Sequence, residues 1–343
     1  MEKVLKSKYK IIEPIQEGEF SSTYKGQVLS DGSPALIETF KRSYLDSSLI
    51  RTLQEKVTAL QPLSDPHIVR LIDGDYGWQG FYFIKEYFEG TTLKALQRAK
   101  PRFEIDEVVS FAKQIAGALA AAHRRQIAHG YLRPEFIWIA GDKLKVSDFA
   151  LANTFENPEQ SRRLLNDSTY LSPEEISGTT CQPAGDCYSL GIILYALLAG
   201  MPPFKGKNQL EVALKHLRDL PVPLSRIRPE VPQYLEEIIL KALAKDPLAR
   251  FPDGEAFLKS LEAKGLPPQL DNLDVNMFRY QTEDEEPKPP PMKTDPEDEK
   301  RGMVGVTRKI SLGERLVNWS LTFLTVILLS GLLFAIIQLV IFK

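Results

Sequence analysis

The spacing of the apolar residues changes near Gly90, and this change restricts the folds that the chain can adopt. Before Gly90, runs of β-branched and aromatic residues alternate with Gly, Pro and Asp, which predicts short strands joined by turns and interrupted by one helix over residues 48–60. After Gly90 the apolar residues recur every three or four positions, most clearly over residues 104–126. Residues 185–200 are apolar nearly all round and predict a buried helix. We therefore expect an α+β fold with a small strand-rich lobe followed by a larger helical lobe.

The composition excludes several classes of function. The 343 residues carry a formal net charge of −2, so no overall positive charge favours nucleic acid as a partner. Four histidines and two cysteines, Cys181 and Cys187, are too few for a zinc site with the usual paired ligands, and they exclude a disulfide scaffold. We therefore expect neither a metal site of this kind nor a nucleic-acid partner.

The last part of the sequence is strongly apolar. Residues 319–342 contain no charged side chain, and as a helix they would extend about 36 Å, enough to cross a hydrocarbon core of about 30 Å. This predicts a transmembrane helix over residues 318–342; the alternative is a long buried core helix. Four Lys and Arg residues lie between positions 301 and 315, whereas only Lys343 follows the span. The positive-inside rule then predicts a single-pass C-terminal anchor with the preceding domain in the cytoplasm.

Between these parts, residues 265–317 have a different composition. The stretch TEDEEPKPPPMKTDPEDEK combines acidic residues with proline and lacks apolar periodicity, so it cannot bury enough surface to offset the entropy of ordering. We expect an acidic, Pro-rich flexible linker that ends in a basic juxtamembrane segment. The predicted organisation is a folded domain over residues 1–264, this linker, and the transmembrane helix.

Several short motifs follow one another along the folded part. In order they are IQEGEFSSTYKG, HGYLRPEF, SDFA, SPEE and GDCYSLG. Together they resemble the protein kinase superfamily, especially membrane-anchored bacterial serine/threonine kinases of the eukaryotic-like type. The resemblance implies a protein-kinase-like two-lobed fold, in which a small antiparallel β-sheet lobe precedes a helical lobe.

Two of these motifs keep the residues that support the fold in that family. The SPE triplet that ends at Glu174 resembles the family's A-P-E motif, and the resemblance implies an ion pair between Glu174 and Arg250. Asp186 matches the aspartate that opens the central helix and supports the catalytic loop. These structural positions are therefore expected to be intact.

The positions that bind nucleotide phosphates in that family are altered. Gly18 stands at the second of three glycine positions, where it suits either a plain hairpin turn or a phosphate contact. Glu38 replaces the lysine of the third strand, unless a shifted alignment brings Lys41 there. At about 4 Å and an effective dielectric near 20, a pair of unit charges is worth about 4 kcal/mol, so Glu38 would repel a phosphate by a similar amount. We therefore expect no cofactor, with ATP binding disfavoured.

A second charged residue stands at an unusual position. Lys85 lies where the family has an apolar residue at the end of a strand. A buried lysine needs a partner, so one hypothesis pairs Lys85 with Glu38 and lets the two fill part of the adenine pocket. The alternative is a Lys85 side chain that points to the surface. Glu55 corresponds to the helix glutamate that normally pairs with the third-strand lysine.

The catalytic loop departs furthest from the family. Where the family reads H-R-D-L-K-P-x-N, Tyr131 replaces the aspartate that accepts the proton of the substrate hydroxyl, and a phenol is a poor base at neutral pH. Phe136 replaces the asparagine that holds a magnesium ion, and its ring offers no lone pair to a hard cation. Asp148 of the SDFA motif could coordinate a cation or hydrogen-bond the backbone.

These departures lead to a functional prediction with two alternatives. We predict that the chain is not an enzyme but a pseudokinase, which acts as a membrane-tethered scaffold or regulator and binds a protein partner. The first alternative is a nucleotide-binding sensor without turnover. The second is an atypical active serine/threonine protein kinase with displaced catalytic groups.

Overall fold

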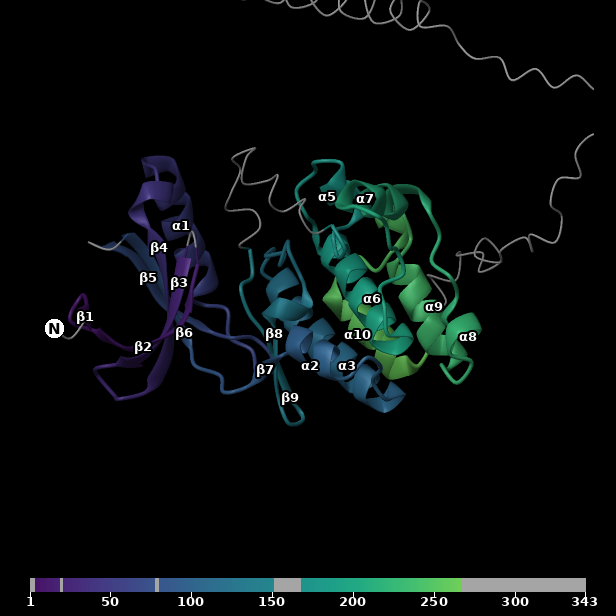
Figure 1. Cartoon of the computed structure of the whole chain (residues 1–343), viewed down its shortest axis with the longest axis horizontal. Helices are drawn as coiled ribbons and strands as arrows, with labels where there is room; N and C mark the ends of the chain where they lie inside the picture. The colour runs from purple at the N-terminus through teal and green to yellow at the C-terminus, as the bar shows by residue number, and fades with distance from the viewer. Residues whose placement is uncertain (1–3, 19–20, 78–79, 151–167, 267–343) are drawn as a thin grey trace, which may run out of the picture. The chain divides into compact units, whose positions relative to one another are not determined.

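The computed structural model describes the greater part of the sequence up to residue 266 (Figure 1). The described residues are 4–18, 21–77, 80–150 and 168–266. They belong to the first of the chain's two compact units, Met1–Gln281; the second is Thr282–Lys343.

The described residues include no helix that is long and apolar enough to cross a membrane. The predicted transmembrane helix over residues 318–342 lies outside them, and so does the predicted linker over residues 265–317 apart from its first two positions. Both therefore remain predictions.

The first lobe is a six-stranded antiparallel sheet with the order β1-β2-β3-β4-β6-β5. Its strands are β1 (Val4–Leu5), β2 (Tyr9–Glu17), β3 (Ser21–Val28), β4 (Pro34–Lys41), β5 (Leu71–Gly77) and β6 (Gly80–Glu86). Figure 1 shows these strands on one side of the domain, with the helices α3 to α10 on the other. The predicted strand-rich lobe is confirmed.

The register of β4 against β6 decides where two charged side chains point. Leu36 pairs with Lys85, so Lys85 lies diagonally opposite Glu38 on the same face of the sheet. Ile37 and Ile84 pair with each other on the opposite face, where both are 0% exposed. The alternation of side chains along these two strands therefore directs Glu38 and Lys85 to a common side.

One helix packs on this sheet. Helix α1 (Ser47–Leu60) follows the 3₁₀ turn η1 (Arg42–Tyr44), and the Asp46 side chain caps it by accepting a hydrogen bond from the Leu49 amide at 2.8 Å. It buries Leu53, Val57 and Leu60 against the sheet. A Cβ at Gly74 of β5 would lie 2.6 Å from Val57, so only glycine permits this close packing. The predicted helix over residues 48–60 is confirmed to within one residue.

The second lobe is built mainly from helices. A small sheet of β7 (Thr91–Thr92), β8 (Ile137–Ala140) and β9 (Lys143–Val146) joins it to the first lobe. Its helices are α2 (Leu93–Ala99), α3 (Ile105–His123), α5 (Pro173–Ile176), α6 (Pro183–Ala199), α7 (Gln209–Arg218), α8 (Leu224–Ile227), α9 (Gln233–Ala242) and α10 (Gly254–Ala263), with the 3₁₀ turns η2 (Pro134–Phe136) and η5 (Pro247–Ala249).

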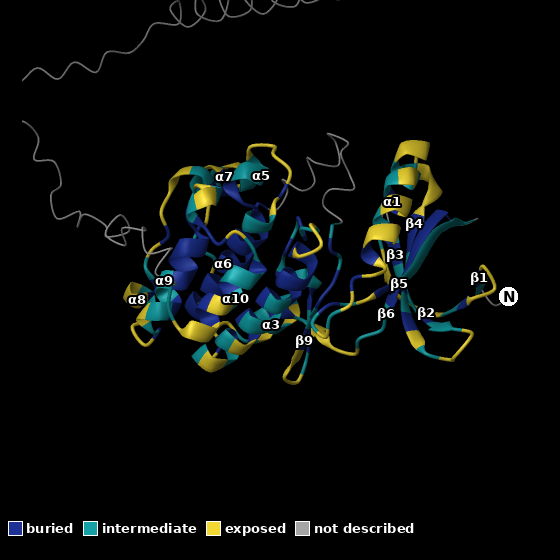
Figure 2. Cartoon of the chain, turned by 180° about the vertical axis from the view of Figure 1, so that it is seen from behind, coloured by how far each residue is buried: buried dark blue, intermediate teal, exposed yellow. Residues whose placement is uncertain are grey.

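Helix α6 forms the centre of this lobe. All its residues from Gly185 to Ala199 are buried, and it packs against α3, α9 and α10 (Figure 2). The sequence predicted a buried helix here because the segment lacks a polar face, and the structure confirms it. The two-lobed α+β architecture predicted from the sequence is thus present in the described residues.

Candidate active site

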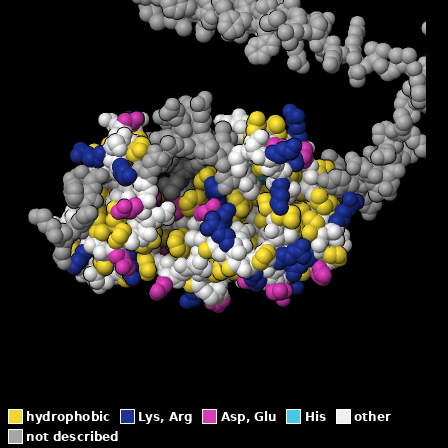
Figure 3. Space-filling view, in the orientation of Figure 1, with side chains coloured by type: hydrophobic (Ala, Val, Ile, Leu, Met, Phe, Trp, Pro, Cys, Tyr) yellow, Lys and Arg dark blue, Asp and Glu magenta, His cyan; other side chains and the backbone are white. Residues whose placement is uncertain are grey.

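A cleft of about 680 Å³ lies between the sheet and the helical lobe. Its walls come from β2, β3 and β4, from the connection after β6, and from η2 and the segment after β9. Volumes of about 300–1,000 Å³ are typical of small-ligand sites. Figure 3 shows one face of the domain, on which Lys and Arg side chains are interspersed with Asp and Glu. The cleft is therefore the candidate site, and its chemistry depends on the residues that line it.

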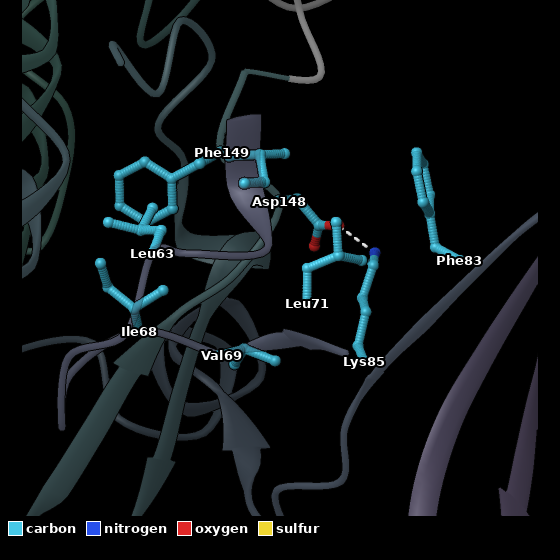
Figure 4. A pocket seen from close by; sticks show the side chains of 9 residues that line it. Leu63, Ile68, Val69, Leu71, Phe83, Lys85, Asp148 and Phe149 are labelled. Atoms are coloured by element: carbon cyan, nitrogen blue, oxygen red, sulfur yellow. Dashed lines mark hydrogen bonds and ion pairs between the residues drawn. The ribbon is translucent and has the colours of Figure 1, made fainter. Parts of the chain in front are cut away.

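Lys85 projects into this cleft and bridges two carboxylates. Its Nζ lies 2.7 Å from Glu38 Oε2 and also donates a hydrogen bond to Asp148 (Figure 4). Burial lowers the pKa of Lys85, but the charges of Asp148 and Glu38 outweigh burial and hold the pKa above its usual value. Lys85 is therefore a charged ammonium at the wall of the cleft. The surface-pointing alternative does not describe this side chain.

Asp148 faces Lys85 from the helical lobe. Its backbone has φ of 66°, in the left-handed region, and its side chain also accepts a hydrogen bond from the Ser147 hydroxyl. Burial raises the pKa of Asp148, but the charge and hydrogen bond of Lys85 hold it below the usual value. Asp148 is thus an ionised carboxylate bonded to an ammonium and a hydroxyl.

The ion pair also borders a second, smaller cavity. This cavity has about 30 Å³ and is lined by apolar side chains that include Phe149 and Ile68 (Figure 4). Lys85 and Asp148 line both cavities, so their ion pair separates the cleft from the apolar space behind it.

Asp186 hydrogen-bonds the segment that corresponds to the catalytic loop. Its carboxylate accepts hydrogen bonds from the amides of His129 at 2.6 Å and Gly130 at 2.9 Å, and it lies 2.9 Å from Nε2 of His123. Burial raises the pKa of Asp186, but its bonds to His123 and the neighbouring charges keep it below the usual value. Asp186 therefore has the supporting geometry that the resemblance implies.

Aromatic rings stand at the two altered positions of this loop. The Tyr131 hydroxyl accepts a hydrogen bond from Arg133, whose guanidinium carbon lies 4.8 Å from the centre of the Tyr131 ring. The Phe136 ring lines the cleft, 5.9 Å from the Tyr131 ring between centroids. The neighbouring Glu135 also lines the cleft, and its Oε2 is buried without a hydrogen-bond partner among the described atoms. Glu135 is the one carboxylate of this loop that faces the cleft, and the sequence analysis did not single it out.

Gly18 lies at the end of the hairpin between β2 and β3. Its amide donates a hydrogen bond to the Ser21 carbonyl at 2.9 Å, and a Cβ here would lie 2.8 Å from that oxygen. Gly18 also lines the cleft. The turn therefore explains why a glycine is needed at this position. Because Gly18 also lines the cleft, its position is compatible with a phosphate contact as well.

The prediction for Glu55 is wrong. Its side chain is 71% exposed and lies 3.9 Å from Arg51 one helical turn earlier. Lys56 instead points inward and donates a hydrogen bond to the Ala150 carbonyl, directly after the SDFA aspartate and phenylalanine. The buried positions of α1, at residues 53, 57 and 60, would have placed residue 56 and not 55 on the inner side.

The ion pair implied for the helical lobe is bidentate. Arg250 donates two hydrogen bonds to Glu174, each at 2.8 Å, and further ones to the carbonyls of Ala244 and Lys245. Arg250 is 1% exposed. This planar pairing fixes α5, which carries Glu174, to the loop before α10.

The donor set of the cleft does not fit the divalent metal ions of the family. Phe136 has no lone pair, and Asp148 is already bonded to Lys85 and Ser147. Within residues 4–266 as described, no group of three or more His, Cys, Asp or Glu side chains could hold a metal ion. The positive charge in this part of the cleft is the ammonium of Lys85.

Comparison with known families places the chain. The protein kinase domain family matches residues 9–259. The chain belongs to this family. The superfamily resemblance seen in the motifs is therefore confirmed, and the fold is that of a protein kinase domain.

Several similar proteins are bacterial kinases. The chain is 31% identical over 299 residues to the serine/threonine-protein kinase PrkC of Bacillus subtilis, covering 86% of this chain and 46% of PrkC. It is 31% identical over 262 residues to a probable serine/threonine-protein kinase, PknB, of Lactococcus lactis, covering 75% and 42%. A probable serine/threonine-protein kinase of Clostridium perfringens is 29% identical over 264 residues, covering 76% and 38%. The chain thus spans less than half the length of these relatives.

A solved structure supports the fold. The crystal structure of the kinase domain of Mycobacterium tuberculosis PknI superposes with a TM-score of 0.61 at 20% sequence identity, covering 76% of this chain and 98% of that domain. At this identity the likeness concerns the fold alone.

These comparisons correct one expectation. The altered positions Glu38, Tyr131 and Phe136 predicted that the chain is not an enzyme. The relatives are named serine/threonine-protein kinases across the matched domain, so the family points toward an enzyme and the prediction was wrong. Lys85 of β6 brings an ammonium to the cleft from a strand other than the one that carries Glu38.

Proposed function

We propose that this chain is an atypical serine/threonine protein kinase that binds ATP in the cleft between its lobes. The observation that carries the proposal is Lys85, whose ammonium enters a cleft of about 680 Å³ and is ion-paired with Asp148. A kinase uses a lysine ammonium at the phosphates that is held in place by a carboxylate. Lys85 of β6 offers the ammonium from another strand, and Asp148 offers a carboxylate from the SDFA motif. The names and matched domain of the relatives support the same activity.

The reaction would transfer the γ-phosphoryl group to a serine or threonine hydroxyl. The bond between the γ-phosphorus and the oxygen of ADP breaks, a bond to the hydroxyl oxygen forms, and the hydroxyl proton leaves. Phosphoryl transfer depends mainly on positioning and on charge stabilisation, because its transition state is loose. Lys85 would stabilise the phosphate charge, and Asp148 and Glu38 would hold Lys85 in place.

The proton needs a new acceptor in this proposal. Tyr131 stands where the family has its aspartate, and its hydroxyl already accepts a hydrogen bond from Arg133. We assign the role to Glu135, whose buried Oε2 has no partner among the described atoms and which lines the same cleft. A positioned base contributes about 10²–10⁴ in rate. Glu135 stands one residue before the family's metal-binding position and not at its base position, so we expect turnover well below the 1–100 s⁻¹ typical of kinases.

The test is a radiolabelled phosphotransfer assay on the full chain with a mixture of serine and threonine peptides. We expect slow transfer that Lys85→Met abolishes and that Glu135→Gln reduces at least about tenfold. The matched control is Lys259→Met, which removes an exposed lysine paired with Glu255 at 2.8 Å, far along the chain from the cleft. ATP binding without any phosphotransfer by the unaltered protein would contradict the kinase proposal and favour a nucleotide sensor.

We also propose that residues 318–342 anchor the domain to a membrane, with its protein substrate as the partner. The absence of charge over residues 319–342 and the basic residues before them support this proposal. The experiment is a membrane-fractionation assay in which Leu328 and Leu332 are both replaced by Arg. The unaltered chain should sediment with membranes after carbonate washing and the variant should be released; equal release of both would contradict the anchor.

A further inference from the structure

The ammonium of Lys85 is enclosed by carboxylates from both lobes. Glu38 belongs to β4 of the sheet, and Asp148 follows β9 of the helical lobe. The side chains of Lys85, Glu38 and Asp148 are 9%, 17% and 13% exposed. A single positive charge therefore links two negative ones in a place with little access for water.

Without the lysine, this place would suit a divalent cation. Two carboxylates in contact with one common atom, together with the hydroxyl of Ser147 on Asp148, are oxygen ligands of the kind that Mg²⁺ and Mn²⁺ bind. Lys85 Nζ contacts both carboxylates, so a metal ion could approach them only by displacing the ammonium. Phe136, at the position where the family has a metal-binding asparagine, adds no ligand.

We propose that the ammonium of Lys85 takes the place of a divalent cation between Glu38 and Asp148, so that the cleft binds nucleotide phosphates without metal. The first half of this proposal is that the ammonium replaces a divalent cation, and it does not depend on the proposed function. The second half is that phosphates bind without metal, and it rests on the proposed ATP binding. An ammonium has three N–H donors, and Glu38 and Asp148 accept two of them. Lys85 lines the larger cleft as well as the smaller cavity, so its third donor can meet a phosphate oxygen in the cleft. Among the described residues, the Phe83 ring also lies near this ammonium, 5.8 Å from Nζ to the ring centre.

The first half is tested by titrating the full chain, solubilised in detergent, with Mn²⁺. For the unaltered protein we expect no change in melting temperature and no bound Mn²⁺ in its paramagnetic resonance spectrum. Lys85→Met exposes the two carboxylates to each other, and millimolar Mn²⁺ should then raise its melting temperature by about 3 °C. Lys85→Met combined with Asp148→Asn should lose this rise, whereas Lys259→Met should behave like the unaltered protein.

Two outcomes of this titration would contradict the first half of the proposal. A bound Mn²⁺ in the unaltered protein that disappears in Asp148→Asn overturns the inference, and this measurement stands even if Lys85→Met fails to fold. A melting temperature of Lys85→Met that does not respond to Mn²⁺ also counts against it.

The second half is tested by measuring ATP affinity with excess Mg²⁺ and with EDTA. We expect the two dissociation constants to agree within about twofold, because the ammonium replaces the metal in both conditions. A loss of affinity of tenfold or more in EDTA would overturn metal-free binding while leaving ATP binding itself intact. No ATP binding in either condition would overturn the proposed function and this half together, and the Mn²⁺ titration would still decide the first half.

Discussion

Two clusters of charged side chains in the domain differ in how their groups are arranged. At the anchor region, formed by Glu174, Arg250 and Asp186, each charge meets the partner that the family pattern implies. At the cleft, Glu38, Lys85 and Asp148 form an ion-pair network assembled from both lobes. The difference shows that the charged residues of the cleft can change while the residues that hold the active-site loop keep the family pattern. The support depends on buried hydrogen bonds, whereas in the cleft one ammonium is shared between two carboxylates.

The largest expected effect concerns the anchor region. Arg250→Met should lower the free energy of unfolding by about 3–5 kcal/mol, because it leaves the Glu174 carboxylate and three carbonyls without their donor. Urea unfolding of the full chain in detergent measures this loss. Lys259→Met, on an exposed side chain, should stay within about 0.5 kcal/mol. A loss below about 1 kcal/mol for Arg250→Met would contradict a large contribution of the Arg250–Glu174 ion pair to the free energy of unfolding.

The cleft should be less sensitive to loss of its cation. Lys85→Met should cost about 2–3 kcal/mol, because it leaves Glu38 and Asp148 as neighbouring anions with partial access to water. Adding Glu38→Gln to Lys85→Met should recover part of the loss, since one of the two anions is then gone. Thermal or urea unfolding of the single and double variants provides the comparison. No loss of stability in Lys85→Met would mean that its ion pairs do not support the fold.

The pH dependence of stability should come from Glu175, the neighbour of Glu174 in α5, whose carboxylate accepts hydrogen bonds from the Ser172 amide and hydroxyl. Burial, aided by the charges of Asp186 and Glu174, raises the pKa of Glu175 to about 7. The native state thus holds a proton that the unfolded chain releases near its usual pKa of about 4.5. The stability that this proton contributes is complete below that value and is lost as the pH rises through about 7, by up to about 1.4 kcal/mol per pH unit.

Comparison with Glu175→Gln isolates this contribution. The difference in unfolding free energy between the unaltered protein and Glu175→Gln should shrink steadily from pH 5 to pH 7 and then level off. Glu262→Gln, on an exposed position of α10, should follow the unaltered protein throughout. Parallel curves for the unaltered protein and Glu175→Gln would contradict a native-state proton on Glu175.

The smallest effects distinguish two neighbours on helix α1. Glu55→Gln should change the free energy of unfolding by less than about 0.5 kcal/mol, because the side chain is 71% exposed. Lys56→Met should cost about 1 kcal/mol, because it removes the hydrogen bond to the Ala150 carbonyl. Denaturant unfolding of both variants measures the difference. A larger cost for Glu55→Gln would restore the inward glutamate that the sequence suggested.

The error at Glu55 shows where motif comparison fails. The motif predicts that a glutamate of this helix faces the cleft, but the direction of a side chain depends on the phase of the helix. That phase is set by Leu53 and Val57, which must be buried against the sheet. A position one residue away is rotated by about 100°, so a one-residue misassignment moves a side chain from the interior to the surface.

Lys85 illustrates the opposite case. Its unusual position in the strand pattern was visible in the sequence, and so was a pairing with Glu38 as one of two hypotheses. The second partner, Asp148, was not predicted, because it lies 63 positions away in the chain and comes from the other lobe. Nothing in the local sequence indicates that a residue expected to bind a metal or the backbone instead accepts a lysine.

The sequence by itself determined the elements of this protein, because strand and helix follow from the spacing of apolar residues and the caps and glycines beside them. It also determined the family, because the order of the short motifs survives many substitutions. Only the tertiary structure decided that the Lys85 ammonium is shared between Glu38 and Asp148. The energy of an ion pair depends on the distance between its charges in space. Glu38 and Lys85 come from the sheet lobe and Asp148 from the helical lobe, and no periodicity along the chain connects them.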